Sequence, residues 1–184
     1  QNVRFRYGTP EKIGGWSQLG ESKLTGVARG LHHFVNSAST KFAAIGTNRI
    51  LYAYSGGVFY DIHPLTNPSG TAITNAFTTT NNSKIVTITF SGSHGFVAGD
   101  IILFGDASTF SAITNSNFGA ADFADKKFMV TSAPTATTIT ITMPSVETGS
   151  GATTSGGITY FQYYHVGPAE QLGAFGWGIS LWGG

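Results

Sequence analysis

Apolar and polar residues alternate with a period of two along much of the chain, which is the pattern of half-buried β-strands. Ile50, Tyr52 and Tyr54, for example, would share one face of such a strand. No stretch has the apolar spacing of a long amphipathic helix, and only residues 118–128 suggest a short helical turn. We therefore predict an all-β protein.

The alternating runs form two groups. In the first group, short turn signals rich in Gly, Asn and Ser separate the strands at a spacing typical of an antiparallel meander, and four such strands make one sheet or one propeller blade. The strands expected in the first group are 29–36, 41–47, 49–55 and 57–63. Those expected in the second group are 84–90, 100–105, 126–133 and 137–143, and a further, aromatic strand is expected over 158–166.

The stretches between these runs suggest a modular organisation. Residues 67–83 are rich in Pro, Asn, Thr and Gly without periodicity, which indicates a connector, and residues 147–157 resemble a loop. We expect an antiparallel meander platform, propeller-blade-like or sandwich-like, made of residues 1–66 plus 158–184. Residues 84–157 would form an inserted small β-barrel or sandwich module.

Composition and charge favour a protein with partners. Charged residues make up 10% of the chain, against about 25% in an average soluble protein, and a low surface charge suits a surface covered by neighbours. Residues 1–49 carry a net charge of +5, and the remaining residues carry −4. A positive segment can meet an acidic partner or passing DNA, although solvated charges explain it equally well. The candidate contacts are Arg4, Arg6, Lys12, Lys23 and Arg29.

The stretch "SGSHGFVAGDIILFGD" (91–106) allows two interpretations. His94 and Asp100 could form a catalytic dyad on a Gly-rich loop, or they could belong to a turn between strands. Gly95 and Gly99 supply the backbone freedom that a tight turn needs, and an apolar strand follows. We favour the turn, with His94 fixing it through a backbone hydrogen bond.

The other ionisable residues do not predict a chemical site. There is no Cys, which removes disulfides, thiolate metal sites and Cys nucleophiles. His32 and His33 are adjacent and would point to opposite faces of a strand, so they cannot bind one ion together. Asp61 and His63 share a face but have no third ligand nearby in sequence. We expect no metal, no cofactor and no enzymatic activity.

Aromatic side chains are the best candidates for an interface, where Tyr and Trp are enriched. We expect subunit contacts within residues 49–62 and 174–182. The candidates are Tyr52, Tyr54, Phe59, Tyr60, Phe175, Trp177 and Trp182. The alternative is that the aromatic residues stack on sugars, which would make the chain a secreted or virion-borne carbohydrate-binding module.

Two long segments carry a family resemblance: "FRYGTPEKIGGW" (5–16) and "LTGVARGLHHFVNSASTKFAAIGTNRILYAYSGGVFYDIHPL" (24–65). They resemble the start of the nozzle or tail-tubular proteins, also called tail stabilisation proteins, of short-tailed bacteriophages. "IVTITFSGSHGFVAGDIILFGDAS" (85–108) is similar to a small β module inserted in phage tail and fibre proteins.

The resemblance implies a virion protein without catalysis. It would form a homo-oligomeric ring with other tail proteins around the channel for DNA ejection. No apolar run is long enough to span a membrane. The chain is much shorter than the nozzle proteins, and its 184 residues cannot close a propeller. We expect a processed product, a segment of a longer polypeptide, or a reduced relative that builds its sheet from several subunits.

Overall fold

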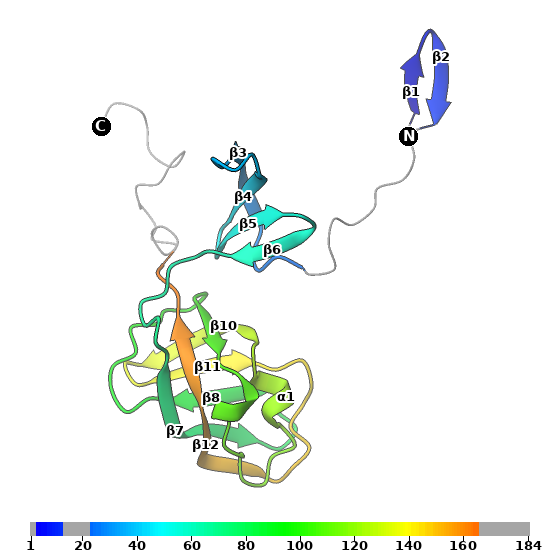
Figure 1. Cartoon of the computed structure of the whole chain (residues 1–184). Coiled ribbons are helices and arrows are strands. Elements are labelled where there is room, and N and C mark those ends of the chain that lie inside the picture. Colours follow the sequence, from blue (N-terminus) through cyan, green and yellow to red (C-terminus); the bar gives the residue numbers. More distant parts are fainter. Residues whose placement is uncertain (1–2, 13–22, 166–184) are drawn as a thin grey trace, which may run out of the picture. The chain divides into compact units, whose positions relative to one another are not determined.

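The computed structural model describes residues 3–12 and 23–165 and confirms an all-β fold with antiparallel sheets (Figure 1). The chain divides into two compact units, residues 1–62 and 63–184. Within the described residues, no helix is long and apolar enough to cross a membrane.

The first unit contains a hairpin and a meander. The hairpin pairs β1 (Val3–Arg6) with β2 (Thr9–Lys12). The meander is an antiparallel four-stranded sheet in the order β3-β4-β5-β6, so the predicted meander is confirmed. Its strands are β3 (Ala28–Val35), β4 (Lys41–Thr47), β5 (Leu51–Ser55) and β6 (Val58–Asp61).

Local side chains close the first two turns of the meander. Between β3 and β4, the Asn36 side-chain oxygen accepts hydrogen bonds from the backbone N–H groups of Ala38 and Thr40, at 3.0 and 2.9 Å. Between β4 and β5, the Thr47 hydroxyl accepts the backbone N–H of Ile50 at 2.8 Å. Such short-range bonds are a property of the turn sequence itself, which explains why the meander is visible in the sequence.

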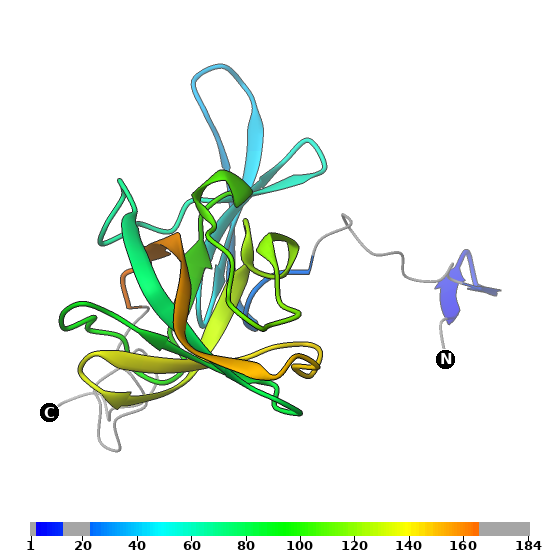
Figure 2. The ribbon, with the colours of Figure 1, turned by 90° about the horizontal axis from the view of Figure 1, so that it is seen from below.

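The second unit contains a closed six-stranded barrel, in which every pair of neighbouring strands is antiparallel (Figure 2). The strand order is β10-β11-β8-β7-β12-β9, and pairing of β9 with β10 closes the barrel. The 3-10 turn η1 (Ala107–Thr109) and the single-turn helix α1 (Ala120–Phe123) lie between β9 and β10. The strands are β7 (Thr71–Thr80), β8 (Ile85–Thr89), β9 (Ile101–Phe104), β10 (Lys127–Thr135), β11 (Thr138–Thr142) and β12 (Gly151–Gln162).

The structure differs from the predicted boundaries at β7 and β12. Residues 71–80, expected in a connector, form β7, and residues 151–162 form one strand that pairs with β7 and β9 within the barrel. Two register shifts bend β12 between Ala152 and Gly157. A Cβ atom on Gly157 would lie 2.1 Å from the Ile73 carbonyl oxygen, so this close approach requires glycine. The glycines that suggest a loop in the sequence therefore serve a β-bulge.

The barrel interior is a packed apolar core. Phe123 of α1 packs against Phe77 and Phe104, with ring centroids 4.9 and 5.7 Å apart. Full burial of each such side chain contributes about 1.5–3 kcal/mol, so these contacts hold the helical turn against the barrel. The buried strand residues of this core are Ile73, Ala76, Phe77, Val86, Ile88, Ile102, Phe104, Val130, Ile139, Ile141, Ile158 and Tyr160.

Candidate interaction surface

Strand register divides the side chains of the meander between two faces, because residues directly opposite each other in antiparallel strands share a face. We name these the Tyr52 face and the Tyr60 face. The Tyr52 face holds Leu31, His33, Val35, Lys41, Ala43, Ile45, Tyr52, Tyr54, Phe59 and Asp61. The Tyr60 face holds His32, Phe34, Phe42, Ala44, Leu51, Ala53, Val58, Tyr60 and, because its N–H donates to the Leu51 carbonyl, Ile62.

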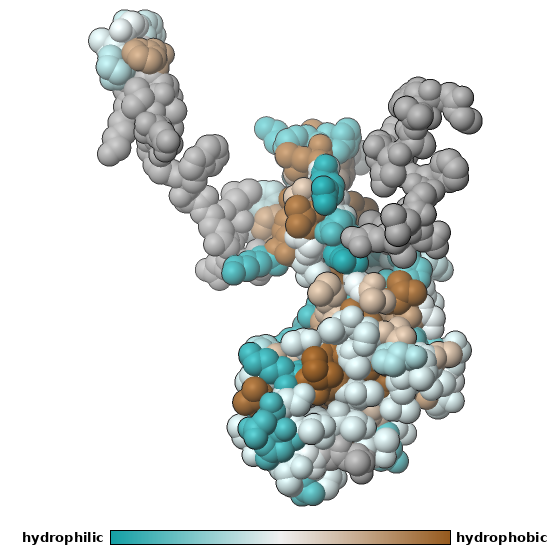
Figure 3. All heavy atoms as spheres, turned by 180° about the vertical axis from the view of Figure 1, so that it is seen from behind, coloured by the Kyte–Doolittle hydropathy of each residue, from teal (hydrophilic) through white to brown (hydrophobic). Residues whose placement is uncertain are grey.

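The Tyr60 face exposes a row of large apolar side chains. Val58, Tyr60 and Ile62 are 49%, 51% and 48% exposed. Leu51 is also exposed, and so is Phe34, which stacks on Phe42 with ring centroids 5.3 Å apart. Apolar residues of this unit are visible at its surface in Figure 3. Contiguous exposed apolar patches on a small unit mark sites of interaction.

The two outer strands of the meander add unpaired backbone to this apolar surface. Within the described residues, β3 pairs only with β4, and β6 pairs only with β5. Every residue of β3 is exposed, and residues 30–35 contain no Lys, Asp, Glu or Pro to protect the edge. Unprotected edge strands offer free N–H and C=O groups to another strand.

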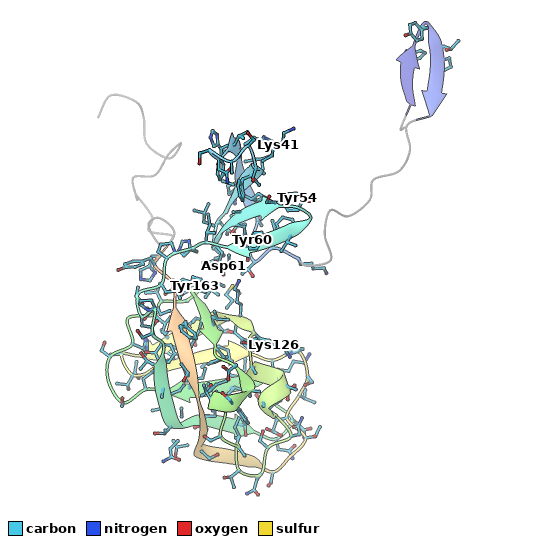
Figure 4. All side chains as sticks on the ribbon, viewed as in Figure 1. Lys41, Tyr54, Tyr60, Asp61, Lys126 and Tyr163 are labelled. Atoms are coloured by element: carbon cyan, nitrogen blue, oxygen red, sulfur yellow. The ribbon has the colours of Figure 1, made fainter. Side chains whose placement is uncertain are left out.

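On the Tyr52 face, the candidate aromatic residues are more enclosed. Tyr52 is 6% exposed, and its hydroxyl accepts the Thr25 backbone N–H at 3.1 Å, which leaves little of the ring for a neighbouring subunit. Tyr54 and Phe59 are half-buried and pack on each other, with ring centroids 4.8 Å apart. Tyr54 and Tyr60 are labelled in Figure 4. Tyr60 is thus the most accessible of the four described candidates.

The remaining candidate residues are only partly described. Phe175, Trp177 and Trp182 lie outside the described residues. Lys23 and Arg29 are exposed, so both are free to meet an acidic surface. The side chains of Arg4, Arg6 and Lys12 lie outside the described part of the structure. Contact of these basic residues with DNA or an acidic partner stays a prediction.

In the second unit, His94 holds the turn that precedes β9, as the sequence predicted. Its Nδ1 atom accepts the Phe96 backbone N–H at 2.9 Å, which assigns the ring proton to Nε2. That Nε2–H donates to the Thr135 carbonyl at 3.0 Å. Gly95 and Gly99 have φ angles of +69° and +91°, which favour glycine.

Asp100 belongs to the same turn but has different partners. Its Oδ2 accepts the Val97 backbone N–H at 2.8 Å, and its Oδ1 lies 2.9 Å from the His165 Nδ1. The His94 ring bonds instead to the backbone groups of Phe96, Thr135 and Thr138. The two residues are therefore fixed separately, and they do not form the dyad that their spacing allowed.

Among the described residues, two depressions on the barrel surface are large enough to consider as sites. One, of about 620 Å³, is lined by residues 93–98 and 132–136, and the His94 ring that lines it already uses both nitrogens. The other, of about 390 Å³, is lined by Thr79, Thr80, Thr114, Asn115, Ser150, Gly151 and Ser155, none of which titrates near neutral pH. Over residues 3–12 and 23–165, no three His, Asp or Glu residues gather as metal ligands. The expectation that the chain is not an enzyme stays a prediction.

Glu147 is the one fully buried carboxylate of the described residues, and sequence reasoning missed it. It accepts the backbone N–H groups of Asn117 and Gly149 at 2.9 and 2.8 Å and the hydroxyl groups of Ser116 and Thr79. Burial raises the pKa of this carboxyl, but the hydrogen bonds together outweigh burial and hold the pKa below its ordinary value. A charged carboxylate so fully bonded joins two loops and is a structural group.

Comparisons with known proteins give only a low structural similarity and no sequence match. No protein-family model matches the sequence, and no curated protein sequence matches it significantly. Among solved structures, the chain is similar to the phage phi92 endosialidase, with 17% sequence identity and a TM-score of 0.38. The match covers 73% of this chain and 18% of that chain. A similarity this low carries no conclusion about the function of this chain.

Proposed function

We propose that this chain is a structural protein of a bacteriophage virion, a nozzle or tail-tubular component. In this proposal, identical subunits assemble with each other and with neighbouring tail proteins around the DNA channel. The proposal draws its family from the resemblance of residues 5–16 and 24–65 to nozzle proteins. It includes no catalytic step and no cofactor.

The observation that carries the proposal is the open, apolar meander of the first unit. Its Tyr60 face leaves Val58, Tyr60 and Ile62 about half exposed, and within the described residues its outer strands β3 and β6 each pair with one neighbouring strand only. Exposed apolar surface costs about 25 cal/mol for each Å² that burial would remove from water. A sheet of this kind gains stability when its face and edges are covered, which is what assembly with other copies supplies.

The exposed charges of the first unit are consistent with a DNA channel. Lys23 and Arg29 are exposed, and residues 1–49 carry the net positive charge of the chain. Contact with phosphates through such residues would be independent of DNA sequence and sensitive to salt. We therefore expect at most weak, salt-dependent binding of DNA and no preference for a particular sequence.

The test is the oligomeric state of the purified chain. Size-exclusion chromatography with light scattering should give a mass of several subunits, and electron microscopy should show rings or sheets. A stable monomer that is retained on a glycan column would refute assembly and support the carbohydrate-binding alternative. A monomer that binds no glycan would refute both functions.

A further inference from the structure

The β6 edge of the meander is more apolar than the β3 edge. On the Tyr60 face, β6 and the residue after it present Val58, Tyr60 and Ile62, each about half exposed. On the same face, β3 presents Gly30, which has no side chain, followed by His32 and Phe34. A strand added beside β6 would find a row of three apolar side chains spaced two residues apart.

Residues 174–182, with the sequence AFGWGISLW, have a matching pattern. Large apolar residues occupy positions 175, 177, 179 and 181, with only Gly or Ser between them. In an extended backbone these four side chains would lie on one face, and the other face would hold small residues up to position 180, with Trp182 at its end. The segment carries no charged residue, so water is a poor environment for it.

We propose that residues 174–182 of one copy add as a strand to the β6 edge of a neighbouring copy. The apolar side of the segment would extend the Tyr60 face beside Val58, Tyr60 and Ile62, and its glycines would lie on the Tyr52 face. Backbone hydrogen bonds supply affinity in this mode of recognition, and the alternate side chains supply specificity. The inference rests on the proposed function, because it names the contact through which copies assemble.

The described chain is held in place up to residue 165. The Tyr164 N–H donates to the Pro64 carbonyl at 3.1 Å, and His165 contacts Asp100 at 2.9 Å. Residues 166–173 then separate this anchor from the proposed strand. Eight residues extend to at most roughly 26 Å, which is the reach that this linker gives the segment beyond its anchor.

Two variants of the full chain remove the two sides of the contact. Trp177→Ser removes the largest side chain on the apolar side of the donated strand, which holds positions 175, 177, 179 and 181. Tyr60→Lys places a charge in the middle of the acceptor edge, and because Tyr60 is half exposed, the sheet should still fold. By light scattering, each variant alone should be a monomer at concentrations where the unaltered chain assembles.

Mixing the two variants tests whether the contact joins different copies. The Tyr60→Lys chain still has an intact strand to donate, and the Trp177→Ser chain still has an intact edge to accept it. An equal mixture should therefore form a particle with the mass of two chains, which cannot grow further. Gln171→Ala, between anchor and strand, and Leu31→Lys, on the other face and edge, are controls that should assemble normally.

The outcomes separate the inference from the proposed function. If both variants assemble like the unaltered chain, the strand contact is refuted while the structural function stands. If both are monomeric but their mixture stays monomeric, the segment does not join copies in this way, and the inference is also refuted. If the unaltered chain is itself a monomer, both proposals fail. Circular dichroism must show the same β content in every variant.

Discussion

Glu147→Gln is the most informative single change in the barrel, because it removes a charge and almost no volume. Glu147 is 0% exposed and bonded to two backbone N–H groups and two hydroxyls. The glutamine oxygen can still accept the N–H groups of Asn117 and Gly149. The amide nitrogen would replace the oxygen that faces the Ser116 hydroxyl, which can accept a bond in return.

The expected loss follows from the strength of these bonds. A hydrogen bond to a charged group contributes about 1.5–3 kcal/mol, against about 1 kcal/mol for a neutral one. Weakening the two backbone bonds from charged to neutral strength therefore predicts a loss of about 1–4 kcal/mol in the free energy of unfolding near neutral pH. The effect is confined to the loops that Glu147 joins, so the β-strands should keep their pairing.

The same bonds predict a dependence on pH. Hydrogen bonding holds the pKa of Glu147 in the folded protein below its value in the unfolded chain. The charged carboxylate therefore contributes stability above the unfolded pKa of about 4.3. That contribution is lost as the pH falls through the lower, folded pKa. The glutamine variant lacks it, so the difference between the two proteins should shrink over this acidic range.

Both effects can be measured by urea unfolding and, in a separate experiment, by calorimetry, each at neutral and at acidic pH. Hydrogen exchange at the Asn117 and Gly149 amides should accelerate in the variant and localise the change. Asp106→Asn is a matched control, because Asp106 is an exposed carboxylate bonded to Ser108, and it should change stability much less. Equal stability of the Glu147→Gln variant and the unaltered chain at every pH would refute the reasoning.

Four further predictions concern the barrel. His94→Ala removes hydrogen bonds to the backbone groups of Phe96 and Thr135 and should lower the free energy of unfolding by about 2–3 kcal/mol, measured by thermal unfolding. If the variant instead kept its fold and assembly but lost an activity of the protein, His94 would have a chemical role. Gly157→Ala should destabilise the barrel because the added Cβ would clash with backbone, whereas Gly92→Ala, with nothing within 4 Å, should have little effect in the same urea titration. Phe123→Ala should lower the free energy of unfolding by about 3–5 kcal/mol in calorimetry, because it opens a cavity between α1 and the strands. A loss under about 1 kcal/mol, roughly the contribution of one buried methylene group, would mean that the helical turn is not part of the core. Burial raises the pKa of the Tyr160 phenol, since the charged form is disfavoured there, so its ultraviolet titration should occur at higher pH than that of a tyrosine side chain in an unfolded peptide.

Local sequence pattern was sufficient for most of the strands. β4, β8 and β11 lie where alternating apolar residues placed them, because a period of two is a property of extended backbone that needs no tertiary information. The turns of the meander and the turn at His94 were equally visible, since Asn side chains and glycines form such turns through hydrogen bonds and backbone angles within a few residues. The all-β fold and the meander therefore follow from the sequence by itself.

Only the tertiary structure decided that residues 71–80 and 151–157 belong to the barrel strands β7 and β12. Their Thr-rich and Gly-rich sequences lack clear alternation, and they become strands because long-range pairing and a bulge close the barrel around its aromatic core. Glu147 was also invisible, because three of its four partners, Thr79, Ser116 and Asn117, are distant in sequence. Likewise, alternation places Tyr52 and Tyr60 on strands, but burial of one and exposure of the other depend on what packs against each face.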